Sequence, residues 1–206
     1  MAKLDLMQLT VAADELLEVT ENPLQRQILE VYRRHVLLEV AGRWEEIFAP
    51  DMIVEHPIYR INAAISLNDA GATEVFDGMR EVKAFYEALM ENGAPVMTVE
   101  QQSLAVADWG YANECILHHQ VPGAALLGMG VDVDDPQAFY VQSYYIVAVW
   151  HHDSRGRLIG EHLYEAKPGS RTVVKLAPED VISQQEARAV LDPLIRPLPV
   201  FEAVPA

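Results

Sequence analysis

The most constraining feature of this 206-residue chain is a change in the spacing of its apolar residues at Gly93. Before Gly93, apolar side chains recur every three or four residues, which is the period of an amphipathic helix. After it, Val, Ile, Tyr and Phe alternate with polar residues, which is the period of a half-buried strand. Helices followed by a run of strands indicate an α+β fold in which a mostly antiparallel sheet packs on helices.

The expected helices come early in the chain. A cap and a first-turn proline at residues 20–23 start the clearest helix, which is expected to run to about Val40. A weaker helical pattern covers residues 6–18. A short helix is expected around 44–48, and a second clear helix starts at Asp77-Gly78 and ends at Asn92-Gly93. These segments supply the apolar faces on which a sheet can pack.

The expected strands are residues 52–59, 96–107, 110–121, 138–151 and 157–166. Loops are expected at residues 60–75 and 122–136, and a final helix is expected from Pro178 to about Leu191, before a proline-broken tail. The chain therefore divides into an N-terminal arm (1–22), a central domain (23–167) and a C-terminal helix with a proline-rich tail (168–206).

Charge and composition limit the partners. The chain has 15 Lys and Arg against 31 Asp and Glu, a formal net charge of -16, which repels phosphate backbones and anionic lipid. We therefore expect no nucleic-acid partner and no membrane partner. The N-terminus lacks the pattern of a signal peptide, and no apolar run reaches the length of about 20 residues that a membrane helix needs. A cytoplasmic protein is expected.

Sequence motifs for cofactors and metals are missing. Cys115 is the one cysteine, so neither an internal disulfide nor a cysteine metal cluster can form. No phosphate-binding loop, dinucleotide fingerprint, zinc-binding HExxH or calcium loop occurs. We expect a protein that uses no cofactor and no metal, with a small hydrophobic molecule as its partner.

His56 is the leading candidate for chemistry. It ends the first expected strand, in the stretch Phe48 to Pro57, where an ionisable side chain can face a pocket between helices and sheet. An imidazole with its ordinary pKa near 6.5 can accept a proton at neutral pH and return it. The alternative is a histidine whose ring is satisfied by backbone groups at a strand end.

Three further side chains are candidates for catalysis. His35 interrupts an apolar helical face, where a neutral imidazole could orient His56 or donate to a substrate oxygen, unless it is a hydrogen-bonded core residue. Tyr144 could hold an enolate-like oxygen, and His162 lies on the last strand. Alternation leaves open which face of that strand is interior. Side chains expected to contact substrate are Tyr32, Tyr59, Asn113, His118 and Trp150.

Three segments together resemble a known family: Tyr32 to His56, Phe76 to Tyr86 and Gly156 to Tyr164. Their order and spacing resemble the nuclear-transport-factor-2-like superfamily, especially its SnoaL-like polyketide-cyclase and ketosteroid-isomerase branches. The resemblance implies a cone-shaped, strongly curved sheet closed by three helices, with a pocket inside the cone. It also implies a homodimer.

The resemblance assigns roles, with departures. His56 occupies the place of a proton-shuttling aspartate, and His35 that of an oxyanion-binding tyrosine. The third isomerase residue, a protonated aspartate, has no acidic match between Tyr144 and Trp150. The final Glu-His-Trp-Asp motif of SnoaL-like members here ends in Leu163 and Tyr164.

The function expected from these features is acid–base catalysis without a cofactor, on a small hydrophobic carbonyl or hydroxy compound, by an isomerase, dehydratase or cyclase. One alternative is an epoxide hydrolase of the same fold, which predicts an acidic residue and an arginine side by side in the pocket. Another is a non-catalytic binding or assembly module. It predicts a shallow or plugged cone and a large apolar outer face of the sheet.

Overall fold

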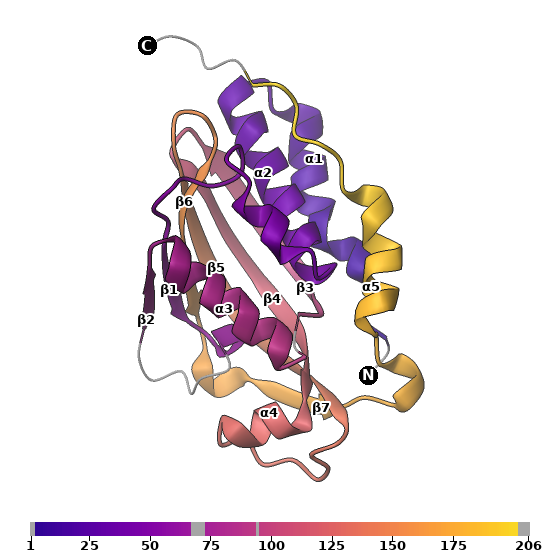
Figure 1. Ribbon diagram of the computed structural model, residues 1–206. Helices are drawn as coiled ribbons and strands as arrows, with labels where there is room; N and C mark the ends of the chain where they lie inside the picture. Colours follow the sequence, from indigo (N-terminus) through magenta and orange to yellow (C-terminus); the bar gives the residue numbers. More distant parts are fainter. Residues whose placement is uncertain (1–2, 67–72, 94, 202–206) are drawn as a thin grey trace.

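The computed structural model describes residues 3–66, 73–93 and 95–201. Over these residues seven strands form one sheet in the order β2-β1-β6-β5-β4-β3, with β7 paired to β5 (Figure 1). The strands are β1 (Ile58–Asn62), β2 (Glu74–Asp77), β3 (Met97–Ala107), β4 (Gly110–Pro122), β5 (Phe139–His152), β6 (Leu158–Glu165) and β7 (Thr172–Lys175). Neighbours run antiparallel except β1 and β6, which run parallel.

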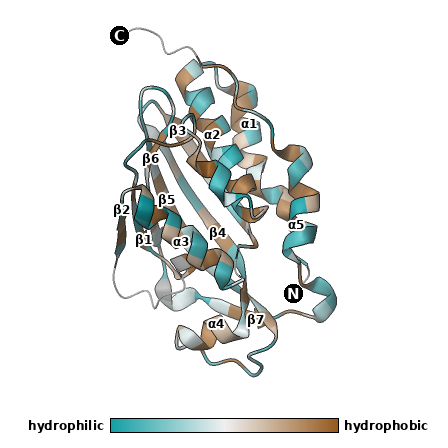
Figure 2. Ribbon diagram, in the orientation of Figure 1, coloured by the Kyte–Doolittle hydropathy of each residue, from teal (hydrophilic) through white to brown (hydrophobic). Residues whose placement is uncertain are grey.

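The α-helices are α1 (Val11–Val19), α2 (Pro23–Val40), α3 (Met79–Glu91), α4 (Gly123–Gly128) and α5 (Gln184–Leu191), with a 3-10 turn η1 (Leu6–Thr10) before α1. The Asn22 side chain accepts hydrogen bonds from the first backbone N–H groups of α2, as the sequence predicted for this start. Figure 1 places α2 and α3 over one face of the sheet. Both helices carry hydrophobic and hydrophilic residues along their length (Figure 2), and their buried residues include Ile28, Leu38, Val82 and Leu89. The predicted α+β class is confirmed.

The strand register fixes which side chains share the face under the helices, here called the inner face. On β4, β5 and β6, Tyr111, Trp150 and Glu161 lie side by side in register. Side chains alternate along a strand, so Tyr144 on β5 faces inward with Trp150, whereas Tyr145 faces outward. Gln101 has a positive φ of 54° where the β3–β4 register shifts, which is a bulge that bends the edge strand.

Several details differ from the predicted elements, and one of them is β2, which was missed because it begins inside the predicted 60–75 loop. Pro57 has no N–H and follows a bend, so β1 begins at Ile58, not at residue 52. The predicted loop at 122–136 contains α4, and β7 was missed because its four residues pair only with β5. The final helix starts at Gln184, because Ser183 and Glu186 form its capping box. Residues 67–72 of the predicted 60–75 loop lie outside the described residues.

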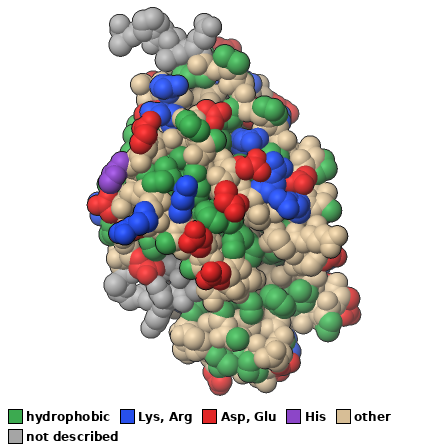
Figure 3. All heavy atoms as spheres, in the orientation of Figure 1, with side chains coloured by type: hydrophobic (Ala, Val, Ile, Leu, Met, Phe, Trp, Pro, Cys, Tyr) green, Lys and Arg blue, Asp and Glu red, His purple; other side chains and the backbone are tan. Residues whose placement is uncertain are grey.

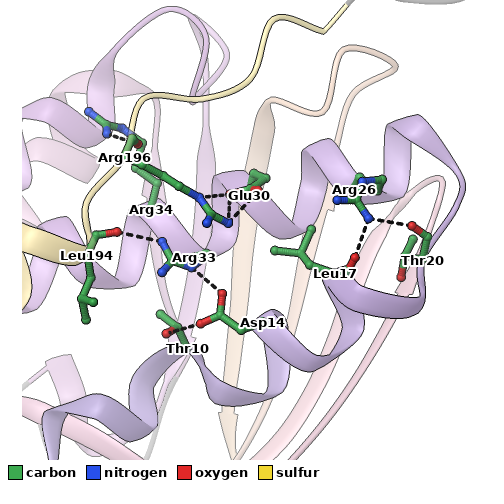
Figure 4. Close-up of polar contacts among 10 residues, drawn as sticks. All are labelled: Thr10, Asp14, Leu17, Thr20, Arg26, Glu30, Arg33, Arg34, Leu194 and Arg196. Atoms are coloured by element: carbon green, nitrogen blue, oxygen red, sulfur yellow. Dashed lines mark hydrogen bonds and ion pairs between the residues drawn. The ribbon is translucent and has the colours of Figure 1, made fainter.

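The N-terminal helix α1 and the segment that follows α5 both lie against α2 (Figure 4). The buried Arg33 side chain donates to the Asp14 carboxylate at 2.6 Å and to the Leu194 carbonyl at 2.9 Å. Arg34 donates to the Arg196 carbonyl at 2.6 Å. The N-terminal and C-terminal segments also contribute buried side chains to the hydrophobic core. These are Leu6, Leu9, Ala13, Leu17, Ile182, Ala187 and Leu191. The division of the chain into three segments stays a prediction.

None of the helices that the structure describes combines the length and apolar composition needed to cross a membrane.

Candidate functional site

A small cavity of about 60 Å³ lies between α2 and the inner face of the sheet. A volume of this kind holds a few water molecules at roughly 10–15 Å³ each, whereas pockets for drug-sized ligands span about 300–1,000 Å³. The cavity is lined by Leu9, Tyr32, Val36, Glu39, Val40, Ile65, Met97, Val99, Tyr111, Asn113, Leu117, Ile146, Ala148, Trp150, Glu161 and Leu163. It is apolar around a few polar groups.

Two glutamates in this lining are buried. Glu39 on α2 and Glu161 on β6 are each 8% exposed. Burial raises the pKa of Glu39 to about 8. Burial also raises the pKa of Glu161 well above its ordinary value, and the nearby Glu39 carboxyl adds to that shift. Two carboxyl groups in one apolar site cannot both ionise cheaply, so at neutral pH the pair retains protons.

His35 joins this pair to two tyrosines. Its Nε2 lies 2.7 Å from the Tyr86 hydroxyl and 3.8 Å from the Glu39 carboxylate. The Tyr59 hydroxyl lies 3.5 Å from that of Tyr86. Burial, with a contribution from His152, lowers the pKa of His35 to about 3, so its ring is neutral at physiological pH. The sequence allows two interpretations of His35, a neutral imidazole and a hydrogen-bonded core residue. Both descriptions fit the ring that the structure shows.

Further polar groups face the interior without partners. The Asn113 Oδ1 atom and the Tyr144 hydroxyl are buried and accept or donate no hydrogen bond among the described residues. Unpartnered buried polar atoms cost free energy, of order 1–3 kcal/mol each, unless water or a ligand satisfies them. The centroid of the Trp150 ring lies 4.5 Å from that of the His35 ring, so Trp150 forms an aromatic wall beside His35.

The structure places six of the nine predicted site residues on the interior side. Tyr32, Asn113 and Trp150 line the cavity, and His35, Tyr59 and Tyr144 are buried beside or behind it. The Tyr32 hydroxyl accepts a 2.7 Å hydrogen bond from Gln102. Their roles in catalysis or binding stay predictions.

The expected inward orientation of His56 is wrong. Its side chain is 71% exposed and its Nε2 lies 2.7 Å from the Asp77 carboxylate, which is itself 61% exposed. The chain bends at Glu55 and His56 before Pro57, so the ring precedes β1 and projects from the surface. His56 therefore cannot reach the cavity in this structure.

His118 and His162 lie on the outer face of the sheet, so they do not have the inward orientation that their expected roles require. His118 contacts the Ser143 hydroxyl at 2.7 Å and the Glu100 carboxylate at 3.0 Å. The ring of His162 packs 4.9 Å from that of His151. Because Glu161 points inward, its neighbour His162 must point outward.

Sequence reasoning missed Glu39, Glu161 and Tyr86. A signal existed for Glu39, since it follows His35 by four residues and so lies on the same side of α2. Glu161 and His162 lie on opposite faces of the same strand, and only the tertiary structure decides which face is interior. Tyr86 sits in the apolar stripe of α3, where a tyrosine reads as core.

Two features bear on the alternatives. Among the described residues, no group of three or more His, Cys, Asp or Glu side chains could hold a metal ion. The described residues lining the cavity include two glutamates and no arginine, unlike the acid–arginine pair that the epoxide-hydrolase alternative predicts.

A larger groove, about 660 Å³, lies between α3 and α4 on the outside and is lined mainly by Ala, Phe and Leu side chains. Figure 3 shows hydrophobic side chains over this part of the surface.

No protein-family model and no curated protein matches this sequence. Solved structures do match. The epoxide hydrolase/cyclase-like enzyme SalBIII, of pyran ring formation in salinomycin, is 10% identical with a TM-score of 0.43, covering 74% of this chain and 95% of that one. The S. rosetta CaMKII hub is 17% identical with a TM-score of 0.46, covering 72% and 100%.

RV0760c from Mycobacterium tuberculosis, solved with estradiol-17beta-hemisuccinate, is 14% identical with a TM-score of 0.42, covering 70% of this chain and 94% of that one. An enzyme, a hub and a steroid complex thus share the likeness, which concerns fold and not activity. The seven-stranded sheet with helices on one face (Figure 1) is the α+β architecture expected from the sequence, and membership of the nuclear-transport-factor-2-like superfamily stays a prediction.

Proposed function

We propose that this protein is an acid–base catalyst that acts without a cofactor on a small, uncharged carbonyl or hydroxy compound inside the cone. The observation that carries the proposal is the buried pair Glu39 and Glu161 beside a cavity. Burying a carboxyl group is unfavourable by several kcal/mol when it ionises, and packing alone does not require two of them. Such groups are common where proton transfer is needed.

The pair suits proton transfer next to a carbonyl group. At neutral pH one carboxyl can be ionised and accept a proton while the other stays protonated and donates to the substrate oxygen. The substrate proton then moves to the first carboxylate, and the second carboxyl stabilises the charge that develops on oxygen. The neutral His35 ring, held by Tyr86, is a positioning residue for Glu39. This arrangement supports isomerisation, dehydration or ring closure as the proposed reaction.

The size of the cavity supports a second candidate. A volume of about 60 Å³ is closer to the plugged cone that a non-catalytic binding or assembly module predicts. Under this second candidate the carboxyl pair and the unpartnered Asn113 Oδ1 would hold ordered water or a small bound molecule. The catalytic proposal instead requires that the cone opens to admit a substrate.

Deuterium exchange tests the catalytic proposal before a natural substrate is known. Uncharged ketones such as cyclopentanone and 2-cyclohexenone are incubated in D₂O with the protein, and loss of their α-protons is followed by ¹H NMR. We expect protein-dependent exchange that falls about 100-fold or more in Glu161→Gln, the usual range for a lost acid or base. His56→Ala is the control and should keep the wild-type rate.

Equal exchange in wild type and Glu161→Gln contradicts the proposal. A complete lack of protein-dependent exchange across the ketones favours the non-catalytic candidate.

We also propose that the protein is a homodimer that pairs through the outer face of the sheet. That face carries half-buried apolar side chains, including Ile116, Tyr145, Val147 and Val149, and the 38% exposed Tyr164. A contiguous apolar face of this kind marks interaction surfaces. Sedimentation should give a dimer mass, and Val147→Glu should shift it to a monomer. A monomeric wild type contradicts this proposal.

A further inference from the structure

The cavity has one wall that comes from outside the central domain. On one side α2 contributes Val36 and Val40, and on the other the edge strand β3 contributes Met97 and Val99. The side chain of Leu9 completes the lining from η1, which contacts both α2 and β3. Leu9 is 3% exposed, so it is fully packed at this seam.

The N-terminal segment is held differently from the sheet. Over the described residues, the backbone hydrogen bonds of residues 3–19 stay within that stretch or reach Thr20. It docks by buried apolar side chains and by a few polar contacts. The Thr98 hydroxyl donates to the Asp5 carbonyl at 2.6 Å, and Arg33 holds Asp14. Moving the segment therefore breaks no backbone ladder of the sheet.

Local displacement of such a segment needs less free energy than global unfolding, because its contacts with the rest are side-chain contacts. Of the remaining lining residues, Ile65 lies in the short 3-10 turn η3 (Ala64–Ser66), and the others lie on strands of the hydrogen-bonded sheet or on the 18-residue helix α2. The seam between α2 and β3 can therefore open without breaking a strand pairing of the sheet or a turn of α2.

We propose that the N-terminal segment, residues 3–19, is the displaceable wall of the cavity, and that Leu9 sets the size of the molecule the cavity accepts. This inference rests on the proposed function, since it presumes that the cone takes a small uncharged molecule. It explains how a cavity of only about 60 Å³ can accept a larger ligand, and it assigns specificity to a residue of the N-terminal segment.

Size selection is tested with two uncharged probes, phenol and 2-naphthol, by calorimetric titration at neutral pH. Leu9→Ala removes the lining side chain and should increase the affinity for 2-naphthol at least tenfold over wild type, because it extends an existing void. Leu17→Ala is the matched control, since Leu17 is buried in the same segment but is not part of the lining. It should give no gain. Equal gains in the two variants, or no gain in Leu9→Ala, overturn the role of Leu9.

The access route is tested by kinetics. Thr98→Val removes the hydrogen bond to Asp5 while keeping the shape of the side chain. We expect the association and dissociation rates of phenol, measured by NMR line shape, to rise together by roughly two- to tenfold, the size set by one hydrogen bond. Thr172→Val on the exposed strand β7 should leave both rates unchanged. Unchanged rates in Thr98→Val overturn the route.

These outcomes separate from those of the catalytic proposal. Ligand binding that depends on Leu9 and Thr98, without any deuterium exchange, keeps the displaceable wall and rejects the catalysis. Exchange that depends on Glu161, with no effect of Leu9 or Thr98, does the reverse.

Discussion

Two histidine–carboxylate pairs in this molecule have similar chemistry and opposite surroundings. His56 and Asp77 lie 2.7 Å apart with both side chains mostly exposed. His35 and Glu39 lie 3.8 Å apart, with side chains 1% and 10% exposed. The pKa of His35 falls to about 3 and that of Glu39 rises to about 8, and in both cases burial is the main cause.

The comparison shows that separation alone does not make a functional pair. A short contact at the surface is surrounded by water, which screens the charges and leaves a net contribution of about 0–1 kcal/mol. In the interior both partners avoid charge, so each is held in the form that can donate or accept a neutral hydrogen bond. Proton-transfer chemistry is therefore expected at the buried pair.

The largest expected effect is on the pH dependence of stability. The raised pKa of Glu39 means that its contribution is complete below pH about 4.5 and is lost as pH rises toward about 8. The lowered pKa of His35 means that its contribution is present above pH about 6.5 and is lost as pH falls toward about 3. Each pKa unit corresponds to about 1.4 kcal/mol, so both effects amount to several kcal/mol.

Urea denaturation should therefore show greatest stability near pH 5–6, with losses on both sides. Glu39→Gln should reduce the loss between about pH 6.5 and 8 and leave the part that comes from Glu161, whereas Asp77→Asn should leave the loss unchanged. A wild-type profile that is flat across that interval would contradict the raised pKa of the buried Glu39.

Truncation of the two histidines should differ by an order of magnitude. His35→Ala removes a buried ring and leaves the Tyr86 hydroxyl without its 2.7 Å partner, so the free energy of unfolding should fall by about 2–4 kcal/mol. His56→Ala should change it by less than about 0.5 kcal/mol, as is usual for exposed positions. Thermal and chemical denaturation give both values. Similar losses for the two variants would show that burial is not the deciding factor.

The smallest expected effect concerns salt. The exposed His56–Asp77 pair should weaken when NaCl is raised from 0.1 to 1 M, because ions screen surface charges. A double-mutant cycle with His56→Ala and Asp77→Asn should give a coupling free energy below about 1 kcal/mol at pH 6, falling with salt. A coupling that is large and insensitive to salt would contradict the surface assignment.

Periodicity predicted most of the fold. The three- and four-residue spacing located α2 and α3, and alternation located β3 to β6, because these segments bury one face each. The short β7 and α4 were missed because their pairing and capping depend on distant segments. The N-terminal helical pattern was recognised, but the sequence does not reveal that Leu9 lines the cavity between α2 and the sheet.

The site was harder to predict because it depends on direction. His35, Tyr32 and Trp150 lie on elements whose buried faces are evident, and the structure places them inside. His56 follows a bend, and a bend can point a side chain either way. Glu161 and His162 are adjacent on β6, so their side chains point to opposite faces of the sheet. A shift of the strand by one residue would exchange which of them faces the cavity.

The parallel pairing of β1 with β6 has a consequence for biosynthesis. Arg60 to Asn62 are registered with His162 to Tyr164, a separation of about one hundred residues. During translation β1 cannot pair with β6 until nearly the whole sheet has left the ribosome. The apolar sides of α2 and α3 are synthesised before that point. Nascent chains should therefore fold late, and they should depend on protection by chaperones in that interval.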